Sequence, residues 1–143
     1  MRIDLDLPLD RTAYSFAHEV RVRFAETDAM GVAHHSSYVA WFEEARVAYL
    51  RELGHPYAAI REGGHEFAVL ELFAQYRRSA RFEEVVTVHT RVGSVRGATF
   101  QMDYLLTIGD DVCALAATVH GVVDPTGRAV RAPAWLRDLL ANA

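Results

Sequence analysis

Two long runs of alternating apolar and polar residues and a third, mostly apolar run, separated by very short turns, dominate the second half of the chain. EEVVTVHTRV (83–92) and ATFQMDYLLTI (98–108) alternate residue by residue, and VCALAATVHGVV (112–123) has the composition of a final long strand. GSVRG (93–97) and GDD (109–111) leave room only for hairpin connections. Because such short turns make consecutive strands antiparallel, this stretch predicts an antiparallel sheet.

A further strand and one long helix are predicted in the first half. FAHEVRVRF (16–24) alternates like a half-buried strand. Apolar residues then recur at steps of three and four over about 37–53, which places them on one face of a helix. Ser36 or Ser37 can cap the start of this helix, and Gly54 supplies its end.

The predicted fold class is α+β, with one antiparallel sheet packed on one long helix. EFAVLELFAQY (66–76) is expected to be a strand that is apolar on both faces, and the tail (132–143) a short helix. Because one helix covers only one face of a sheet, the apolar strand needs a second subunit. We therefore predict a single domain at 16–143, preceded by an N-terminal extension at 1–15, that assembles as a homo-oligomer.

Charge, hydropathy and cysteine content narrow the class of protein. The net charge of −4 at pH 7 does not favour binding to nucleic acid or to an anionic membrane. No apolar stretch reaches the ~20 residues needed to cross a bilayer. The start, MRIDLDLPLDRTAY, has acids where an export signal needs an unbroken apolar run. The single cysteine, Cys113, fits a reducing compartment, so a cytoplasmic protein is expected.

The sequence has no motif typical of a nucleotide or metal site. It contains neither G-x-x-x-x-G-K-[ST] nor G-x-G-x-x-G after a strand. His34 and His35 are adjacent, so their side chains diverge at a helix start, and no H-E-x-x-H occurs. Cys113 and His120 lie on opposite faces of one predicted strand, and Cys113 is expected to be a small buried hydrophobe. No metal and no cofactor are predicted.

Two groups of arginines are candidates for contact with a phosphate. Arg96 lies at the tip of a predicted hairpin beside two glycines, where backbone and cation could meet a phosphate. Arg77, Arg78 and Arg81 form a basic cluster before strand 83–92. A solvated loop is the alternative interpretation of this cluster.

The loop between strand 16–24 and helix 37–53 holds the main candidate for catalysis. It contains Asp28, and Gly31 allows the chain to fold back. An aspartate in a loop commonly bonds nearby amides, and this structural role is one interpretation. A helix N-terminus, however, presents unpaired N–H groups that suit an oxyanion. An acid and an oxyanion site in one short loop are the parts needed for attack on a carbonyl.

The stretch RVRFAETDAMGVAHHSSYVAWFEEARVAYLRELG (21–54) resembles the opening of hot-dog-fold acyl-CoA thioesterases of the 4-hydroxybenzoyl-CoA thioesterase family. The shared pattern is an aromatic strand end, E-T-D-x-x-G-V, a histidine seven residues after the aspartate, S-x-Y, and an acidic-aromatic helix. QYRRSARFEEVVTVHTRV (75–92) and VVDPTGRAVRAP (122–133) resemble later parts of the family more loosely. The resemblance implies a hot-dog fold, in which a curled antiparallel sheet of about five strands wraps one long helix.

The resemblance also implies roles for individual residues. Asp28 stands at the family's catalytic carboxylate, and His35 at the position whose backbone N–H polarises the thioester carbonyl. The His35 imidazole either orients the reacting groups or packs in the subunit interface. Gly31 and Val32 match the loop that brings these groups together, and Tyr38 either lines the acyl pocket or fills the core. Family members pair as dimers or dimers of dimers, and each active site draws on both chains.

The implied reaction is hydrolysis of an acyl-CoA thioester, with coenzyme A as part of the substrate and not a cofactor. Asp28 attacks the carbonyl as a nucleophile or activates water as a general base. The alternatives are an acyl-carrier-protein thioesterase, marked by a basic patch near the pocket, and a protein that binds acyl-CoA or an acyl carrier without turnover. Two departures, His34 for an aromatic residue and Met30 for a small one, are expected to reshape the acyl pocket and narrow its entrance.

Overall fold

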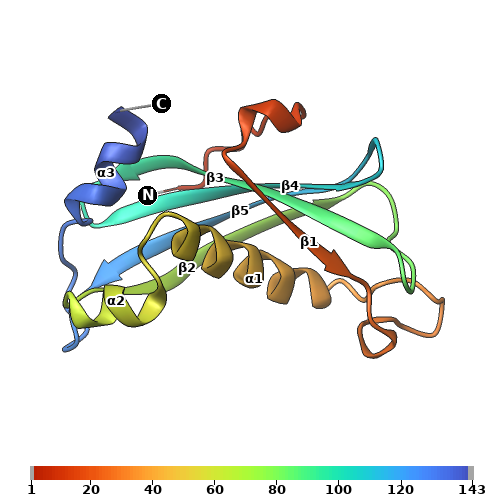
Figure 1. Cartoon of the computed structure of the whole chain (residues 1–143), viewed down its shortest axis with the longest axis horizontal. Helices are drawn as coiled ribbons and strands as arrows, with labels where there is room; N and C mark the ends of the chain where they lie inside the picture. The colour runs from red at the N-terminus through yellow and green to blue at the C-terminus, as the bar shows by residue number, and fades with distance from the viewer. Residues whose placement is uncertain (1, 142–143) are drawn as a thin grey trace.

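The computed structural model describes residues 2–141, which form one antiparallel sheet with a long helix against it (Figure 1). The five strands lie in the order β1-β3-β4-β5-β2, and every pairing is antiparallel, as predicted. The strands are β1 (Phe16–Arg21), β2 (Glu66–Tyr76), β3 (Val85–Arg96), β4 (Thr99–Ile108) and β5 (Asp111–Val123). The helices are α1 (Ser37–Glu52), α2 (Tyr57–Glu62) and α3 (Ala134–Ala141), with 3-10 turns η1 (Arg11–Ala13) and η2 (Phe24–Glu26). None of the helices in this described part is long and apolar enough to span a membrane.

The long helix agrees with the sequence pattern, and a hairpin joins β3 to β4 as expected, but its turn is shorter than the predicted range 93–97. β3 continues to Arg96, so the turn to β4 is formed by Gly97 and Ala98 alone. The register shifts at Gly93, where a Cβ would collide with the carboxylate of Asp103 on β4. A bulge at a glycine therefore lets the strand run on where a turn was expected.

Two short helices lie in segments without a clear periodic pattern. α2 follows Pro56, whose extended backbone precedes the first helical turn. η2 begins at Phe24, so the first strand ends at Arg21 and not at residue 24.

The core lies between α1 and the concave face of the sheet. Phe42 on α1 stacks on Tyr104 of β4 at 4.9 Å, and Tyr49 near the helix end stacks on Phe16 of β1 at 5.4 Å. Cys113 is fully buried in the same cluster, as expected, and burial raises the pKa of its thiol to about 12. This arrangement of a curled five-stranded sheet around one central helix is the hot-dog fold.

A chain of polar side chains is buried in this core. Arg46 on α1 donates from Nη1 to the Tyr104 hydroxyl (3.1 Å), which shares a hydrogen bond with Thr118 Oγ1 (2.9 Å). Thr118 Oγ1 also bonds His120 Nε2 (2.7 Å), and the His120 ring stacks on Phe100. Burial, and then the positive charge of Arg46, lower the pKa of His120 to about 3, so its imidazole is neutral at pH 7.

We expect His120 to make the fold sensitive to acid. The unfolded chain binds a proton at His120 near pH ~6.5, whereas the folded chain does not until about pH 3. The contribution of neutral His120 to the free energy of unfolding is therefore fully present above pH ~6.5 and falls as the pH drops towards 3. The loss attributable to His120 is about 2 kcal/mol between pH 7 and pH 5. Urea unfolding at both pH values should show that His120→Gln loses about 2 kcal/mol less than the wild type; an equal loss in both proteins would contradict this assignment.

The outer face of the sheet is covered by the N-terminal segment 2–15. The backbone of Asp4 forms two hydrogen bonds with the Gln101 side chain, at 2.7 and 2.9 Å. Tyr14 packs with Leu105 of β4 and Leu115 of β5 in a small apolar cluster. In Figure 1 this segment and α1 lie on opposite sides of the sheet.

The strand β2 is an edge of the sheet and exposes apolar side chains on both faces, which agrees with its sequence pattern. Leu72 is 43% exposed and stands opposite Thr118, so it lies on the helix side. Leu70 is 57% exposed and contacts the position of Gly121 from the outer side. An edge with free backbone groups and exposed apolar side chains is suited to pairing with a second chain.

Candidate active site

The loop between β1 and α1 folds back on itself as a short hairpin. Thr27 and Ala33 pair across it, Asp28 N donates to Val32 O (2.9 Å), and Gly31 N donates to Asp28 O (3.0 Å). Gly31 has a φ of +77°, a conformation that side-chain-bearing residues rarely adopt. The turn expected at Gly31 is therefore present, and it brings Val32 back beside Asp28.

This hairpin lies against the segment that connects β2 to β3. Val32 forms an isolated bridge with Arg81, and Ala33 N donates to Ala80 O at 2.7 Å. The two loops are thus hydrogen-bonded at the end of the sheet where α1 begins. These backbone contacts fix the two loops relative to each other.

The Asp28 carboxylate has one oxygen engaged and one free. Asp28 Oδ1 accepts a hydrogen bond from Met30 N (2.8 Å), which is the structural role expected of a loop aspartate. Among residues 2–141 no donor contacts Oδ2. The Met30 side chain is exposed, so within one chain it does not narrow a pocket entrance, contrary to expectation.

His35 lies two residues before the first residue of α1. Within the described chain its backbone N–H donates to no acceptor, whereas the preceding His34 N donates to Glu26 O (2.8 Å). Ser36 occupies the N-cap position of the helix as expected, but its side chain makes no capping bond, and the Ser37 hydroxyl donates to Glu26 O (3.0 Å). The free N–H of His35 at a helix mouth is available to a ligand oxygen.

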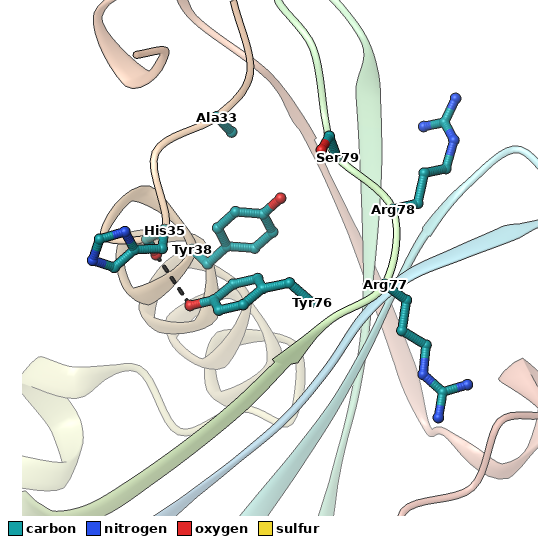
Figure 2. A pocket seen from close by; sticks show the side chains of 7 residues that line it. All are labelled: Ala33, His35, Tyr38, Tyr76, Arg77, Arg78 and Ser79. Atoms are coloured by element: carbon teal, nitrogen blue, oxygen red, sulfur yellow. Dashed lines mark hydrogen bonds between the residues drawn. The ribbon is translucent and has the colours of Figure 1, made fainter. Parts of the chain in front are cut away.

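A pocket of about 200 Å³ opens between the start of α1 and the end of β2 (Figure 2). The Tyr38 and Tyr76 rings meet edge to face at 4.9 Å, and the Tyr76 hydroxyl donates to His35 O (3.4 Å). The lining residues are Ala33, His35, Tyr38, Tyr76, Arg77, Arg78 and Ser79. Of the predicted site residues, His35 and Tyr38 line this pocket. Asp28, Gly31 and Val32 lie in the adjoining hairpin.

Two of the candidate arginines, Arg77 and Arg78, are among the residues that line the pocket. In Figure 2 the side chains of Arg77 and Arg78 point away from the two tyrosines. Arg78 forms ion pairs with Glu84 (3.1 Å) and Asp111 (3.4 Å). Within residues 2–141 the Arg77 side chain bonds only the amide oxygen of Gln75.

Arg96 stands apart from the pocket. It lies at the far end of β3, which runs from the pocket end of the sheet to the opposite end (Figure 1). There it lines a separate hollow with Arg2, Asp4, Ser94 and Val95. Within one chain the structure therefore does not bring Arg96 together with His35.

Two residues at this site were not predicted from the sequence. Glu26 is 9% exposed, and its carboxylate Oε2 accepts a hydrogen bond from Trp41 Nε1 on α1 (2.8 Å). Tyr76 forms a wall of the pocket from the end of β2. Glu26 is the first residue of the E-T-D pattern noted in the sequence, but its bond to Trp41, like the place of Tyr76 in the pocket, joins residues that come together only in the folded chain.

Comparisons with known proteins agree on one family. The model of the thioesterase-like superfamily matches residues 22–140. A protein of Aquifex aeolicus that is provisionally named an esterase is 35% identical over 127 residues, which cover 89% of this chain and 98% of that protein. The acyl-CoA thioesterase YbgC of Haemophilus influenzae is 36% identical over 92 residues, or 64% of this chain and 68% of that protein.

A solved structure supports the same relationship. The DHNA-CoA thioesterase of Staphylococcus aureus superposes with a TM-score of 0.76 at 30% identity. The match covers 80% of this chain and 78% of that one. The two chains therefore share both their fold and a recognisable part of their sequence.

Proposed function

Because the chain belongs to the thioesterase-like superfamily, we propose that it is an acyl-CoA thioesterase that uses Asp28 and the His35 N–H. The observation that carries this proposal is the free backbone N–H of His35 at the helix mouth. The same loop holds the Asp28 carboxylate, of which only Oδ1 is hydrogen-bonded within the described chain. The relative from Haemophilus influenzae is named an acyl-CoA thioesterase, which supports the same substrate class.

In the proposed reaction the thioester carbonyl oxygen accepts a hydrogen bond from His35 N–H. This donor stabilises the negative charge that develops when the carbonyl is attacked, and loss of one such donor typically costs ~3–4 kcal/mol of barrier. Asp28 either attacks the carbonyl to form a mixed anhydride or removes a proton from the attacking water. The C–S bond then breaks, the thiol leaves as coenzyme A, and one water has been consumed to give the free acid.

The hydrogen bond from Met30 N to Asp28 Oδ1 is compatible with a catalytic role of Asp28. It fixes the carboxylate plane by a donor on the same loop and leaves Oδ2 for the reaction. The structural and catalytic interpretations of Asp28 are therefore compatible, because different oxygens serve each of them.

We also propose that the working form is a homodimer joined through β2. The pocket wall formed by Tyr76 stands at the end of this edge strand, and the Tyr76 side chain is 46% exposed. A second chain paired along β2 would cover this wall and the exposed apolar residues of the strand. Each pocket would then be completed by both chains.

A specific observation favours a second candidate substrate, an acyl-carrier protein. Arg77 is exposed at the rim of the pocket, where its side chain has the Gln75 amide as its only partner among the described residues. Arg81 is exposed in the same connecting segment. Cations at this place suit an acidic carrier protein as well as the phosphates of coenzyme A.

The test is release of free thiol from a panel of short, medium, long and aromatic acyl-CoAs and from one acyl-carrier protein. We expect turnover of at least one class of acyl-CoA by the wild type. Turnover of the carrier substrate alone would favour the second candidate. Saturable binding of acyl-CoA without release of thiol would instead identify a binding protein and overturn the proposal.

A further inference from the structure

Glu26 bonds two residues of the segment before α1, Arg23 and His34, and two residues of α1 itself, Ser37 and Trp41. Its carboxylate Oε1 accepts a hydrogen bond from Arg23 N (2.8 Å), and Oε2 accepts one from Trp41 Nε1 (2.8 Å). The Arg23 guanidinium adds an ion pair at 3.4 Å. The backbone oxygen of Glu26 accepts hydrogen bonds from His34 N (2.8 Å) and the Ser37 hydroxyl (3.0 Å).

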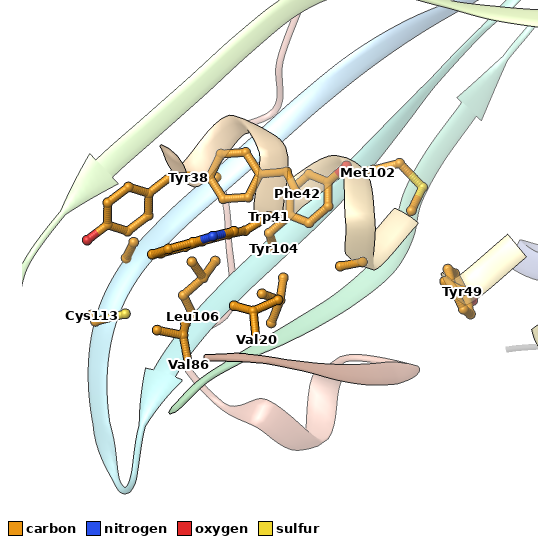
Figure 3. Packing of buried hydrophobic residues seen from close by; sticks show 14 of the residues in the cluster. Val20, Tyr38, Trp41, Phe42, Tyr49, Val86, Met102, Tyr104, Leu106 and Cys113 are labelled. Carbon is orange, nitrogen blue, oxygen red and sulfur yellow. The ribbon is translucent and has the colours of Figure 1, made fainter. Parts of the chain in front are cut away.

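Glu26 is close in the chain to Asp28 and bonded to the residue before His35, the two proposed catalytic positions. It lies two residues before Asp28, and its own carbonyl holds the amide immediately before that of His35. Trp41 is itself fixed in the core beside Tyr38, with ring centroids 4.7 Å apart (Figure 3). A single side chain thus connects the rigid part of α1 to the segment that carries both proposed catalytic groups.

The charge of Glu26 is suited to this role. Burial alone would raise the pKa of its carboxyl, but the bonds from Arg23 N–H and Trp41 and the charge of Arg23 together lower it. The side chain is therefore an ionised acceptor at neutral pH, with donors on both oxygens. Hydrogen bonds to an ionised acceptor are shorter and stronger than those between neutral groups.

We infer that Glu26 is a positioning residue of this site, which holds the Asp28 carboxylate and the His35 N–H in the geometry needed to act on one thioester. This inference rests on the proposed function. It assigns to Glu26 an effect on the rate of the chemical step, acting through the two groups and not through contact with substrate. Misplacement of reacting groups by about 1 Å costs on the order of 100-fold in rate.

The first test is Glu26→Gln, which keeps the size of the side chain but turns an amide N–H₂ towards one of the two N–H donors. We expect kcat to fall about 10- to 100-fold while KM changes less than threefold, because substrate contacts are intact. Trp41→Phe breaks the same contact from the helix side. The two losses should not multiply in the double variant, because both changes remove one connection.

Asp103 provides a matched control, because it is a buried acid on the outer face of the sheet. It bonds Arg91 Nε (2.9 Å) and Gln101 Nε2 (2.7 Å), away from the pocket. Asp103→Asn should lower the unfolding midpoint and leave kcat unchanged. If Glu26→Gln only lowered the midpoint and kept the wild-type kcat at a temperature where both are folded, the inference would be overturned.

A readout without turnover separates this inference from the proposed function. Amide hydrogen exchange over residues 27–35 should be at least about tenfold faster in Glu26→Gln than in the wild type, and unchanged in Asp103→Asn. A wild type that cleaves no thioester refutes the proposed function, and with it a role of Glu26 in catalysis. A wild type that cleaves thioesters, with exchange and kcat unaffected by Glu26→Gln, refutes the inference alone.

Discussion

Asp28→Asn should lower the rate of thioester hydrolysis by at least about 100-fold while the protein stays folded. The substitution removes the charge and the basic oxygen but keeps the shape of the side chain. The asparagine Oδ1 can still accept the hydrogen bond from Met30 N, so the hairpin is expected to keep its conformation. Free-thiol release with the best acyl-CoA of the panel, together with circular dichroism, measures both effects.

The matched control for this variant is Asp138→Asn, which removes an acid from the exposed side of α3. It should retain wild-type turnover. If Asp28→Asn cleaved as fast as the control, the carboxylate would be a structural residue of the hairpin, and another group would have to activate the thioester.

The two chemical roles of Asp28 can be separated by a single turnover in ¹⁸O-labelled water. A mixed anhydride that water opens at the aspartyl carbon leaves one labelled oxygen in the protein, which mass spectrometry of the peptide around Asp28 detects. General-base catalysis puts the label only into the released acid. Label in Asp28 would therefore identify the nucleophile.

Leu72→Arg should convert the proposed dimer to a monomer and abolish most of the activity at the same concentration. Leu72 is exposed on the helix side of β2, so the change does not disturb the core of a single chain. In a β2-joined dimer, by contrast, it would place two unpaired charges in the interface. We expect the dissociation constant to rise by at least about 100-fold.

Sedimentation at several concentrations measures this shift, and turnover at the same concentrations should follow the fraction of dimer. Leu140→Arg, at an exposed apolar position on α3, is the control and should stay dimeric and active. A wild type that sediments as an active monomer would show that one chain forms a complete site.

Much of the fold could be predicted from the sequence because its signals are local. The alternation in 98–108 predicts a strand, and β4 covers residues 99–108, although the folded chain buries both of its faces. The steps of three and four over 37–53 identify α1 almost to its ends. The bulge at Gly93 could not be predicted, because the close approach of the Asp103 carboxylate there exists only once the neighbouring strand is in place.

The candidate site shows the same limit. The spacing of Asp28 and His35 is a local pattern, and the hairpin and helix mouth that it predicted are present. The pocket wall at Tyr76 joins residues 41 positions apart, and the hydrogen bond from Trp41 to Glu26 joins residues 15 apart. Such contacts depend on how the helix lies on the sheet, which single-sequence periodicity does not specify.

The N-terminal segment on the outer face has a practical consequence for how the protein is handled. An affinity tag or surface linker added at this end would continue from a segment that runs opposite α1 and the pocket, so immobilised protein should keep its pocket accessible. Trimming the segment to obtain a shorter chain has the opposite effect. It would expose Leu105 and Leu115, which pack against Tyr14, and the exposed apolar surface would favour aggregation.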